Sequence, residues 1–196
     1  MTLRIEPATG AALQRALPAL AKLRIEVFRE WPYLYEGSLD YEANYIERFA
    51  RLKHGVIVVA SDAGEAVGAA TAAPLEGQNP DVTQPFVERG CDLKKLFYFG
   101  ESVLKRAYRG RGIGHAFFDQ REAAARASRG VEFSTFSGVV RAPDDPRRDP
   151  SYHPLDGFWR KRGYAPVEGL VGHYSWTDIG DQEQTRKPMQ FWMRRL

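Results

Sequence analysis

The sequence predicts a mixed α/β fold in which helices flank a central β-sheet built around one strand–turn–helix unit. Short runs of β-branched and aromatic residues alternate with longer segments whose apolar residues recur every three to four positions. A glycine-rich turn separates an expected strand at 96–104 from an expected helix at 114–128. The 196 residues, 43% of them hydrophobic and 27% charged, fit one globular domain over 1–196.

The first part of the chain is expected to supply a strand, two helices and a hairpin. We expect a strand at 3–5, a helix at 11–30, an aromatic loop at 31–37, a helix at 40–52, and hairpin strands at 56–60 and 66–75 joined by a turn at 61–65. Pro18 predicts a break or a late start in the first helix, because proline removes a backbone donor and clashes with the preceding turn. Gly55 is expected to end the second helix.

The rest of the chain is expected to alternate strands and helices. We expect an insertion at 76–96 with a short helix at about 86–96, a strand at 96–104, a helix at 114–128, a strand at 132–141, a proline-rich loop at 142–154, a helix at 155–162, and final strands at 173–176 and 189–195. The insertion falls between the third and fourth strands and is expected to cover one end of the sheet.

Composition excludes several classes of protein. Cys91 is the only cysteine, so the chain has no intrachain disulfide and no cysteine metal cluster. The four histidines lack metal-ligand spacing, so we expect no metal site. A net charge of +3 is too small to indicate nucleic acid, and no RNA-binding motif is present. Without a long apolar run or a signal-peptide pattern, we expect no membrane association and a cytoplasmic location.

The strongest local motif is the turn Arg109-Gly110-Arg111-Gly112-Ile113-Gly114. Free N–H groups at a helix N-terminus suit phosphate, and glycines let the backbone approach it. The Walker and dinucleotide patterns fail, because each needs a glycine where His115 or Phe117 stands. The pattern Arg-x-x-Gly-x-Gly is satisfied. A plain tight turn with surface arginines is the alternative interpretation.

This turn resembles the acyl-CoA pyrophosphate loop of the GNAT superfamily of N-acyltransferases. Residues 158–164, Phe-Trp-Arg-Lys-Arg-Gly-Tyr, are similar to the end of that superfamily's late helix, and the order of elements matches along nearly the whole chain. The resemblance implies a mostly antiparallel mixed sheet whose fourth and fifth strands splay apart to admit acetyl-CoA. It implies that the pantetheine arm pairs with Ser102, Val103 and Leu104, where ordinary sheet pairing is the alternative, and that N–H groups of 109–114 hold the pyrophosphate.

The implied reaction is direct transfer of an acetyl group from acetyl-CoA to a primary amine of a small molecule or peptide. Glu101 is the candidate base, since the apolar residues around it in its strand would raise the pKa of its carboxyl. The alternative is that Glu101 faces solvent or pairs with an arginine from a neighbouring strand. By resemblance, the loop with Tyr33 and Tyr35 covers the acceptor site; a packed aromatic cap is equally compatible with it.

The chain departs from the superfamily at one position. Many members carry a tyrosine four residues before the glycine that ends the late helix, and here that residue is Trp159, whose indole N–H cannot act as an acid. Tyr152, His153 or water is then left to assist the departing thiolate, with Tyr152 at most a hydrogen-bond donor. A non-catalytic acyl-CoA-binding module on the same fold is the alternative function, a nucleic-acid binder is a weaker one, and a homodimer is left open.

Overall fold

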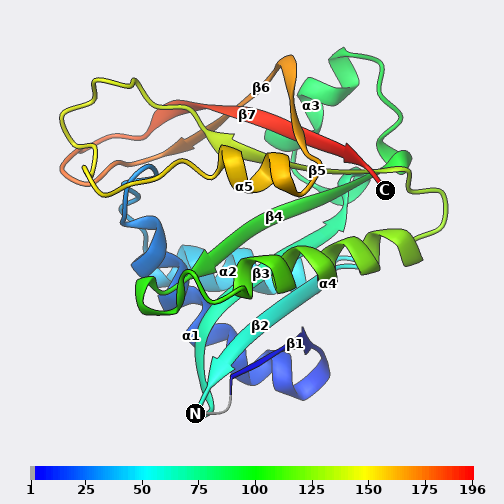
Figure 1. Ribbon diagram of the computed structural model, residues 1–196, viewed down its shortest axis with the longest axis horizontal. Coiled ribbons are helices and arrows are strands. Elements are labelled where there is room, and N and C mark those ends of the chain that lie inside the picture. Colours follow the sequence, from blue (N-terminus) through cyan, green and yellow to red (C-terminus); the bar gives the residue numbers. More distant parts are fainter. Residues whose placement is uncertain (1–2) are drawn as a thin grey trace.

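The computed structural model describes residues 3–196 (Figure 1), so Met1 and Thr2 of the expected 1–196 domain lie outside the described residues. Its elements are β1 (Arg4–Ala8), α1 (Gly10–Phe28), α2 (Leu39–Ala50), β2 (Val56–Asp62), β3 (Glu65–Pro74), α3 (Pro80–Glu88), β4 (Leu96–Leu104), α4 (Ile113–Ala127), β5 (Phe133–Val139), α5 (Asp156–Lys161), β6 (Ala165–Trp176) and β7 (Thr185–Arg195). The predicted mixed α/β class is confirmed.

The strands form one seven-stranded sheet in the order β1-β2-β3-β4-β5-β7-β6. Every neighbouring pair is antiparallel except β4 and β5, which are parallel. The β4–β5 pairing covers only 96–98 against 133–135. Beyond Tyr98 the two strands separate, and the ribbon of β5 rises away from that of β4 (Figure 1).

A bulge in β4 lies directly after this separation. Phe99 is opposite Ala72 and Ser102 is opposite Ala70, so Gly100 and Glu101 together face the single residue Thr71. A bulge of this kind re-aims side chains and loosens pairing. It places Glu101 on the α1 and α2 side of the sheet, where Arg24 and Tyr45 contact its carboxylate.

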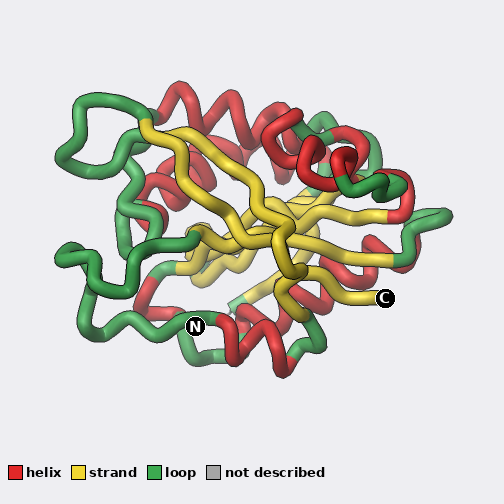
Figure 2. The backbone as a smooth tube through the Cα atoms, turned by 90° about the horizontal axis from the view of Figure 1, so that it is seen from above, coloured by secondary structure: helices red, strands yellow, loops and turns green. Residues whose placement is uncertain are grey.

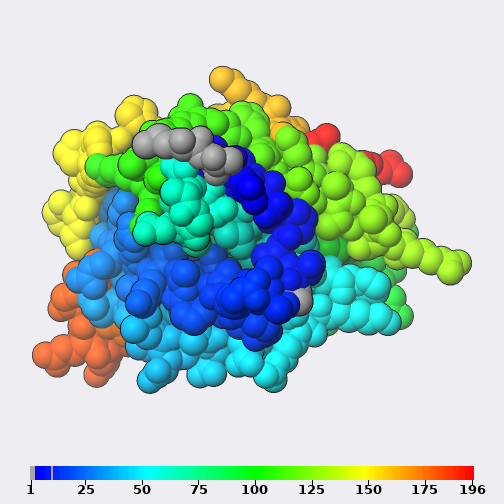
Figure 3. Space-filling model, turned by 90° about the horizontal axis from the view of Figure 1, so that it is seen from below, coloured from blue at the N-terminus to red at the C-terminus, as the bar shows by residue number. Residues whose placement is uncertain are grey.

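Helices cover both faces of the sheet, which runs through the middle of the molecule (Figure 2). Leucines of α1 and the apolar side of α2 pack against β3 and β4, and α1 and β1 form much of the lower surface (Figure 3). On the opposite face, α4 packs its buried phenylalanines over β2, β3 and β4. The short α3 packs against β6.

The expected break at Pro18 is wrong, because α1 runs without interruption from Gly10 to Phe28. Proline removes one hydrogen bond of the helix, but the leucines on either side are anchored in the core. Leu13 and Leu20 are both buried. Tertiary packing of an apolar face supplies most of a helix's stability, and here it outweighs the local cost of proline.

Several other boundaries differ from expectation, most of all those of the insertion helix and of the last two strands. The insertion helix is α3 at 80–88 rather than 86–96, because Asn79 caps it by accepting a hydrogen bond from Val82 N and Pro80 occupies its first turn. The last two strands begin earlier than expected, at Ala165 and Thr185. In β6 a register shift between Pro166 and Val171 interrupts the alternation of polar and apolar residues that normally reveals a strand.

Candidate functional site

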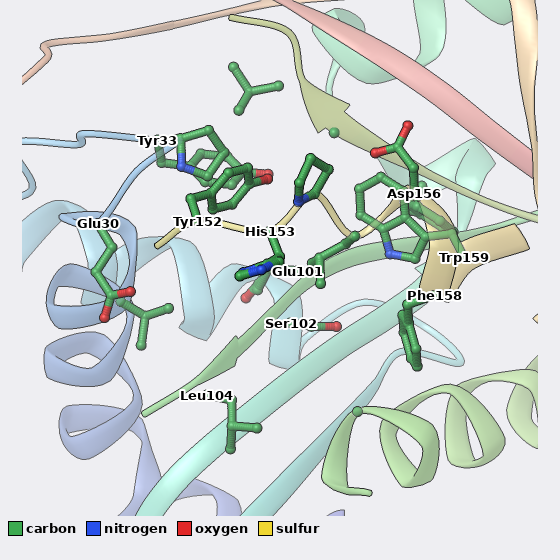
Figure 4. Close-up of a pocket in the computed structure, with 18 of the residues that line it drawn as sticks. Glu30, Tyr33, Glu101, Ser102, Leu104, Tyr152, His153, Asp156, Phe158 and Trp159 are labelled. Carbon is green, nitrogen blue, oxygen red and sulfur yellow. The ribbon is translucent and has the colours of Figure 1, made fainter. Parts of the chain in front are cut away.

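A cavity of about 1120 Å³ opens where β4 and β5 separate. Its walls come from the second half of β4, the far end of β5, the N-terminus of α4, and the loops around residues 31–33 and 142–154. In the close-up, Tyr33 and Tyr152 lie at one end and Phe158 and Trp159 at the other, with Glu101 and Ser102 between them (Figure 4). Most of the predicted site therefore faces one space.

The glycine turn reaches this cavity. Gly110 and Gly112 have φ values of 75° and 79°, and Gly112 is the N-cap of α4. Such left-handed conformations are readily adopted only by glycine. A Cβ built on either glycine meets nothing within 4 Å, so open space lies beside the backbone. The first N–H groups of α4 have no partner within the helix and favour an anion at this end.

The predicted cofactor-binding residues divide into two groups. Those that line the cavity are Ser102, Leu104, Arg109, Gly110, Gly112, Ile113 and Gly114. Val103 instead points into the hydrophobic core, and the Arg111 guanidinium lies 5.0 Å from the centre of the Tyr108 ring. The Val103 side chain is therefore not available for the predicted contacts, and Val103 can contribute only its backbone.

Two ion pairs lie at the mouth of the cavity. Arg109 Nη1 is 2.8 Å from Glu30 Oε2, and the same side chain donates two hydrogen bonds to the carbonyl of Leu104. Arg106 Nη2 is 2.8 Å from Asp149 Oδ2, which joins the end of β4 to the 142–154 loop. Arg106 and Arg109 are thus already paired with carboxylates of the chain, whereas Arg111 lies over the ring of Tyr108.

Glu101 lies in a polar setting, so the expectation of apolar surroundings is wrong. Its Oε1 is 2.7 Å from Arg24 Nη1, and its Oε2 accepts hydrogen bonds from Tyr45 (3.0 Å) and Thr71 (2.9 Å). Arg24 also pairs with the fully buried Glu42. Burial disfavours the Arg24 charge, but Glu101, Tyr45 and Glu42 outweigh burial and raise the pKa of Arg24. The sequence left open pairing with an arginine from a neighbouring strand, but the arginine that pairs with Glu101 comes from helix α1.

The two tyrosines predicted to contact the acceptor are placed differently. Tyr33 lines the cavity, and burial raises the pKa of its hydroxyl. Tyr35 is not among the lining residues and forms an isolated β-bridge with Asp178. Tyr152 lines the cavity beside Trp31, with ring centres 6.4 Å apart.

Trp159 lies in the cavity wall and packs as an aromatic residue. Its ring centre is 5.0 Å from those of Phe136 and Trp192. A Cβ on Gly138 would come within 3.0 Å of the Trp159 ring, so the glycine provides room for the indole.

Sequence reasoning missed a buried charge cluster beside Tyr33 at one end of the cavity. Arg141 lines the cavity, donates to the carbonyls of Pro32 (2.8 Å) and Tyr33 (2.7 Å), and forms a bidentate pair with Asp178. Asp178 also lies 3.2 Å from Lys187 Nζ and 3.1 Å from Arg147 Nη1. Its partners are separated in sequence by up to 46 positions (187 minus 141), and no local pattern connects them.

Arg121 was missed as well, although a signal for it exists. It occupies the position between Phe117 and Ala125 in the buried stripe of α4, where an apolar residue is expected. Its guanidinium is 2% exposed and lines the cavity.

The structure also bears on metal binding and on membrane spanning. Across residues 3–196, the side chains of histidine, cysteine, aspartate and glutamate form no group of three or more that could hold a metal ion. None of the helices in that range combines the length and apolar character needed to cross a membrane.

Comparison with known proteins agrees with the geometry. The model of the acetyltransferase (GNAT) family matches residues 20–148, more than half of the chain. No curated protein matches the sequence significantly. An N-acetyltransferase from Staphylococcus aureus Mu50 shares the fold, with a TM-score of 0.62, 14% identity, and coverage of 100% of this chain and 99% of that one.

Two further solved structures share the fold at similar distance. A ribosomal-protein-alanine N-acetyltransferase from Brucella melitensis has a TM-score of 0.61 at 16% identity, with 98% of this chain and 99% of that chain covered. An aminoglycoside 6'-N-acetyltransferase complexed with coenzyme A has a TM-score of 0.60 at 17% identity, with coverage of 100% and 97%.

Proposed function

Because the chain belongs to the acetyltransferase (GNAT) family, we propose that it transfers an acetyl group from acetyl-CoA to a primary amine of a small molecule or peptide. The observation that carries this proposal is the turn at 109–114. Its two left-handed glycines border open space at the N-terminus of α4, and the same turn lines the cavity between β4 and β5. An anionic pyrophosphate fits that backbone without displacing a side chain.

The cavity offers a route from the turn to a reaction centre. The backbone of Ser102, Val103 and Leu104 would pair with the pantetheine arm, since β5 leaves this part of β4 without a partner on that side. A solved neighbour with this fold holds coenzyme A, which supports acetyl-CoA as the co-substrate.

In the proposed reaction the neutral amine attacks the thioester carbonyl carbon. The carbon–nitrogen bond forms, the carbon–sulfur bond then breaks, the sulfur leaves as thiolate, and the amine loses one proton. Glu101 is the proposed acceptor of that proton, directly or through water. Because Arg24, Tyr45 and Thr71 already contact its carboxylate, the acceptor amine must approach within this network.

Tyr33 and Tyr152 form the proposed acceptor wall, with Tyr152 as a hydrogen-bond donor. A dedicated acid at the position of Trp159 is not part of the proposal, because thiolate is a fair leaving group and indole does not titrate. Tyr35 contributes only by holding the loop against Asp178.

A non-catalytic acyl-CoA-binding module is the second candidate. It is favoured by the Glu101 carboxylate, which has three side-chain partners, and by the absence of an acid at position 159.

The test measures release of free thiol from acetyl-CoA across a panel of small amines and peptide N-termini, with CoA binding followed by calorimetry. Turnover with at least one amine supports the transferase. Binding of CoA without turnover supports the binding module. If neither CoA binding nor turnover is detected, the assignment of the cavity as an acetyl-CoA site is contradicted. A second measurement is retention of the protein on a heparin column with and without acetyl-CoA. If acetyl-CoA abolishes the retention, the cationic surface that binds heparin lies at the proposed acetyl-CoA site, which argues against a nucleic-acid partner.

A further inference from the structure

Arg121, near the middle of α4, carries a charge that is buried where an apolar side chain would be expected. It is 2% exposed, and it stands one turn after Phe117 and one turn before Ala125 on the inner face of the helix. Burial lowers the pKa of Arg121 to about 10, so the guanidinium is still charged near neutral pH. Burying a charge is costly unless a partner compensates for it.

The groups that contact the Arg121 guanidinium directly are neutral, and the carboxylates of Glu101 and Glu122 favour its charge only from beyond ion-pair distance. Nε donates to the carbonyl of Phe117 and Nη1 to the carbonyl of Glu101, each at 3.2 Å. The guanidinium carbon lies 4.5 Å from the centre of the Phe99 ring and 4.7 Å from that of Phe118. Throughout residues 3–196, no carboxylate lies within ion-pair distance of this side chain and Nη2 makes no hydrogen bond.

The hydrogen bond from Arg121 to the Glu101 carbonyl lies at the point where β4 and β5 separate. This carbonyl belongs to the β4 bulge, directly beyond Tyr98, where pairing with β5 ends. In a continuous sheet the neighbouring strand would supply donors to β4 here. Instead, Arg121 contributes a donor from α4, and it does so from the wall of the cavity.

We propose that Arg121 is a positioning residue for acyl transfer: it holds the carbonyl of Glu101 at the β4 bulge and gives the gap between β4 and β5 a positive charge that makes no direct ion pair within residues 3–196. The inference rests on the proposed function. Because the peptide group is planar, fixing this carbonyl also fixes the N–H of Ser102. A fixed positive charge favours a reaction that develops negative charge on a carbonyl oxygen nearby.

A purely structural role does not explain the charge. Methionine has a similar length, fills the space between the rings of Phe99 and Phe118, and has no charge to desolvate. Replacement of buried charges by apolar residues of similar volume is often neutral for stability. We therefore expect replacement of Arg121 by methionine to impair function much more than it lowers stability.

The test compares Arg121→Met with Arg126→Met, a matched control on the same helix. Arg126 is exposed and pairs with Glu122 at 3.6 Å. Backbone hydrogen exchange is measured in the ligand-free protein on peptides that cover β4. The melting temperature of each variant is measured in parallel. We expect Arg121→Met to raise exchange in residues 100–104 at least threefold, and Arg126→Met to leave it unchanged.

The same variants are then assayed with acetyl-CoA and the best amine. We expect Arg121→Met to lower kcat by roughly 10- to 100-fold with the Kd for CoA changed less than threefold, and Arg121→Lys to restore part of the loss. Arg126→Met should retain the kcat of the parent protein.

Unchanged exchange in β4 overturns the inference whether or not the protein is an enzyme. A fall in kcat matched by a proportional loss of folded protein, or no fall at all, also overturns it. If exchange responds as expected while the parent protein turns over no amine, the holding of the β4 bulge by Arg121 stands, and the proposed function and the role in catalysis fail.

Discussion

Substitution of Gly112 separates the two features on which the proposed anion site at the glycine turn depends, its backbone conformation and its charge. The φ of Gly112 is 79°, and space beside it is open, so a side chain meets strain but no clash. For most residues this conformation costs about 1–2 kcal/mol, and asparagine and aspartate tolerate it better than others. Gly112→Asn and Gly112→Asp therefore share shape and strain and differ in one charge.

The charge is expected to decide the affinity for CoA. A carboxylate about 5 Å from one phosphate charge is repelled by ~3 kcal/mol at an effective dielectric constant of about 20, which corresponds to about a hundredfold in Kd. The same carboxylate at the N-terminus of α4 interacts favourably with the helix dipole by about 0.3–1 kcal/mol, so the ligand-free Asp variant should be at least as stable as the Asn variant.

Calorimetry and the thermal shift produced by CoA provide the assay. Gly112→Asn should retain a measurable shift, and Gly112→Asp should lose it. The difference between the variants should shrink as salt is raised, because exposed charges are screened. Equal affinities for CoA in two folded variants would refute the assignment of the pyrophosphate to this turn.

Four other substitutions test the proposed reaction and the charge cluster around Asp178. Glu101→Gln should lower kcat by ~10²-fold or more with little change in the KM for acetyl-CoA, and an unchanged pH–rate profile would remove Glu101 from the mechanism. Tyr152→Phe should cost less than ~10²-fold in kcat, and Trp159→Tyr should stay within a few-fold; a larger loss in Tyr152→Phe with CoA binding intact would make Tyr152 the acid. Asp178→Asn should lower stability by about 3 kcal/mol, because it leaves buried cations unpaired, and the control Asp181→Asn should not.

The effect at Asp178 has a defined pH dependence. Burial disfavours its charged form, but hydrogen bonds from Arg141 and Lys187 outweigh burial and lower the pKa of Asp178. A depressed pKa stabilises the fold above the unfolded value and loses that effect as pH falls through the folded one. The stability gap between the parent protein and Asp178→Asn should therefore be full at neutral pH and narrow below about pH 4. If the difference in stability between the parent protein and Asp178→Asn instead widens in acid, the lowered pKa of Asp178 is contradicted.

Local patterns were sufficient for the elements that carry the glycine turn. The expected strand at 96–104 matches β4, and the expected helix at 114–128 starts one residue after α4 and ends one residue after it. The family followed from the turn and from residues 158–164, and the family model confirms it. These features depend on neighbouring residues in the chain, which is why sequence alone reveals them.

Features that depend on distant residues could not be predicted. Arg24 reaches Glu101 from 77 positions away, and only the packing of α1 against the sheet brings them together. Pro18 stays helical because the core holds the leucines around it. In both cases tertiary contacts outweigh local preference.

The ion pairs at the mouth of the cavity, Arg109 with Glu30 and Arg106 with Asp149, mean that the protein carries its own counter-ions. An incoming polyanion does not meet Arg106 and Arg109 as bare cations; to contact them it must exchange places with two tethered carboxylates that cannot diffuse away. Binding is then a competition within one molecule, so affinity depends less on dissolved salt than the number of arginines suggests. The displaced carboxylates of Glu30 and Asp149 also stay close to the arginines and can pair with them again. This competition favours rapid release of an anionic product.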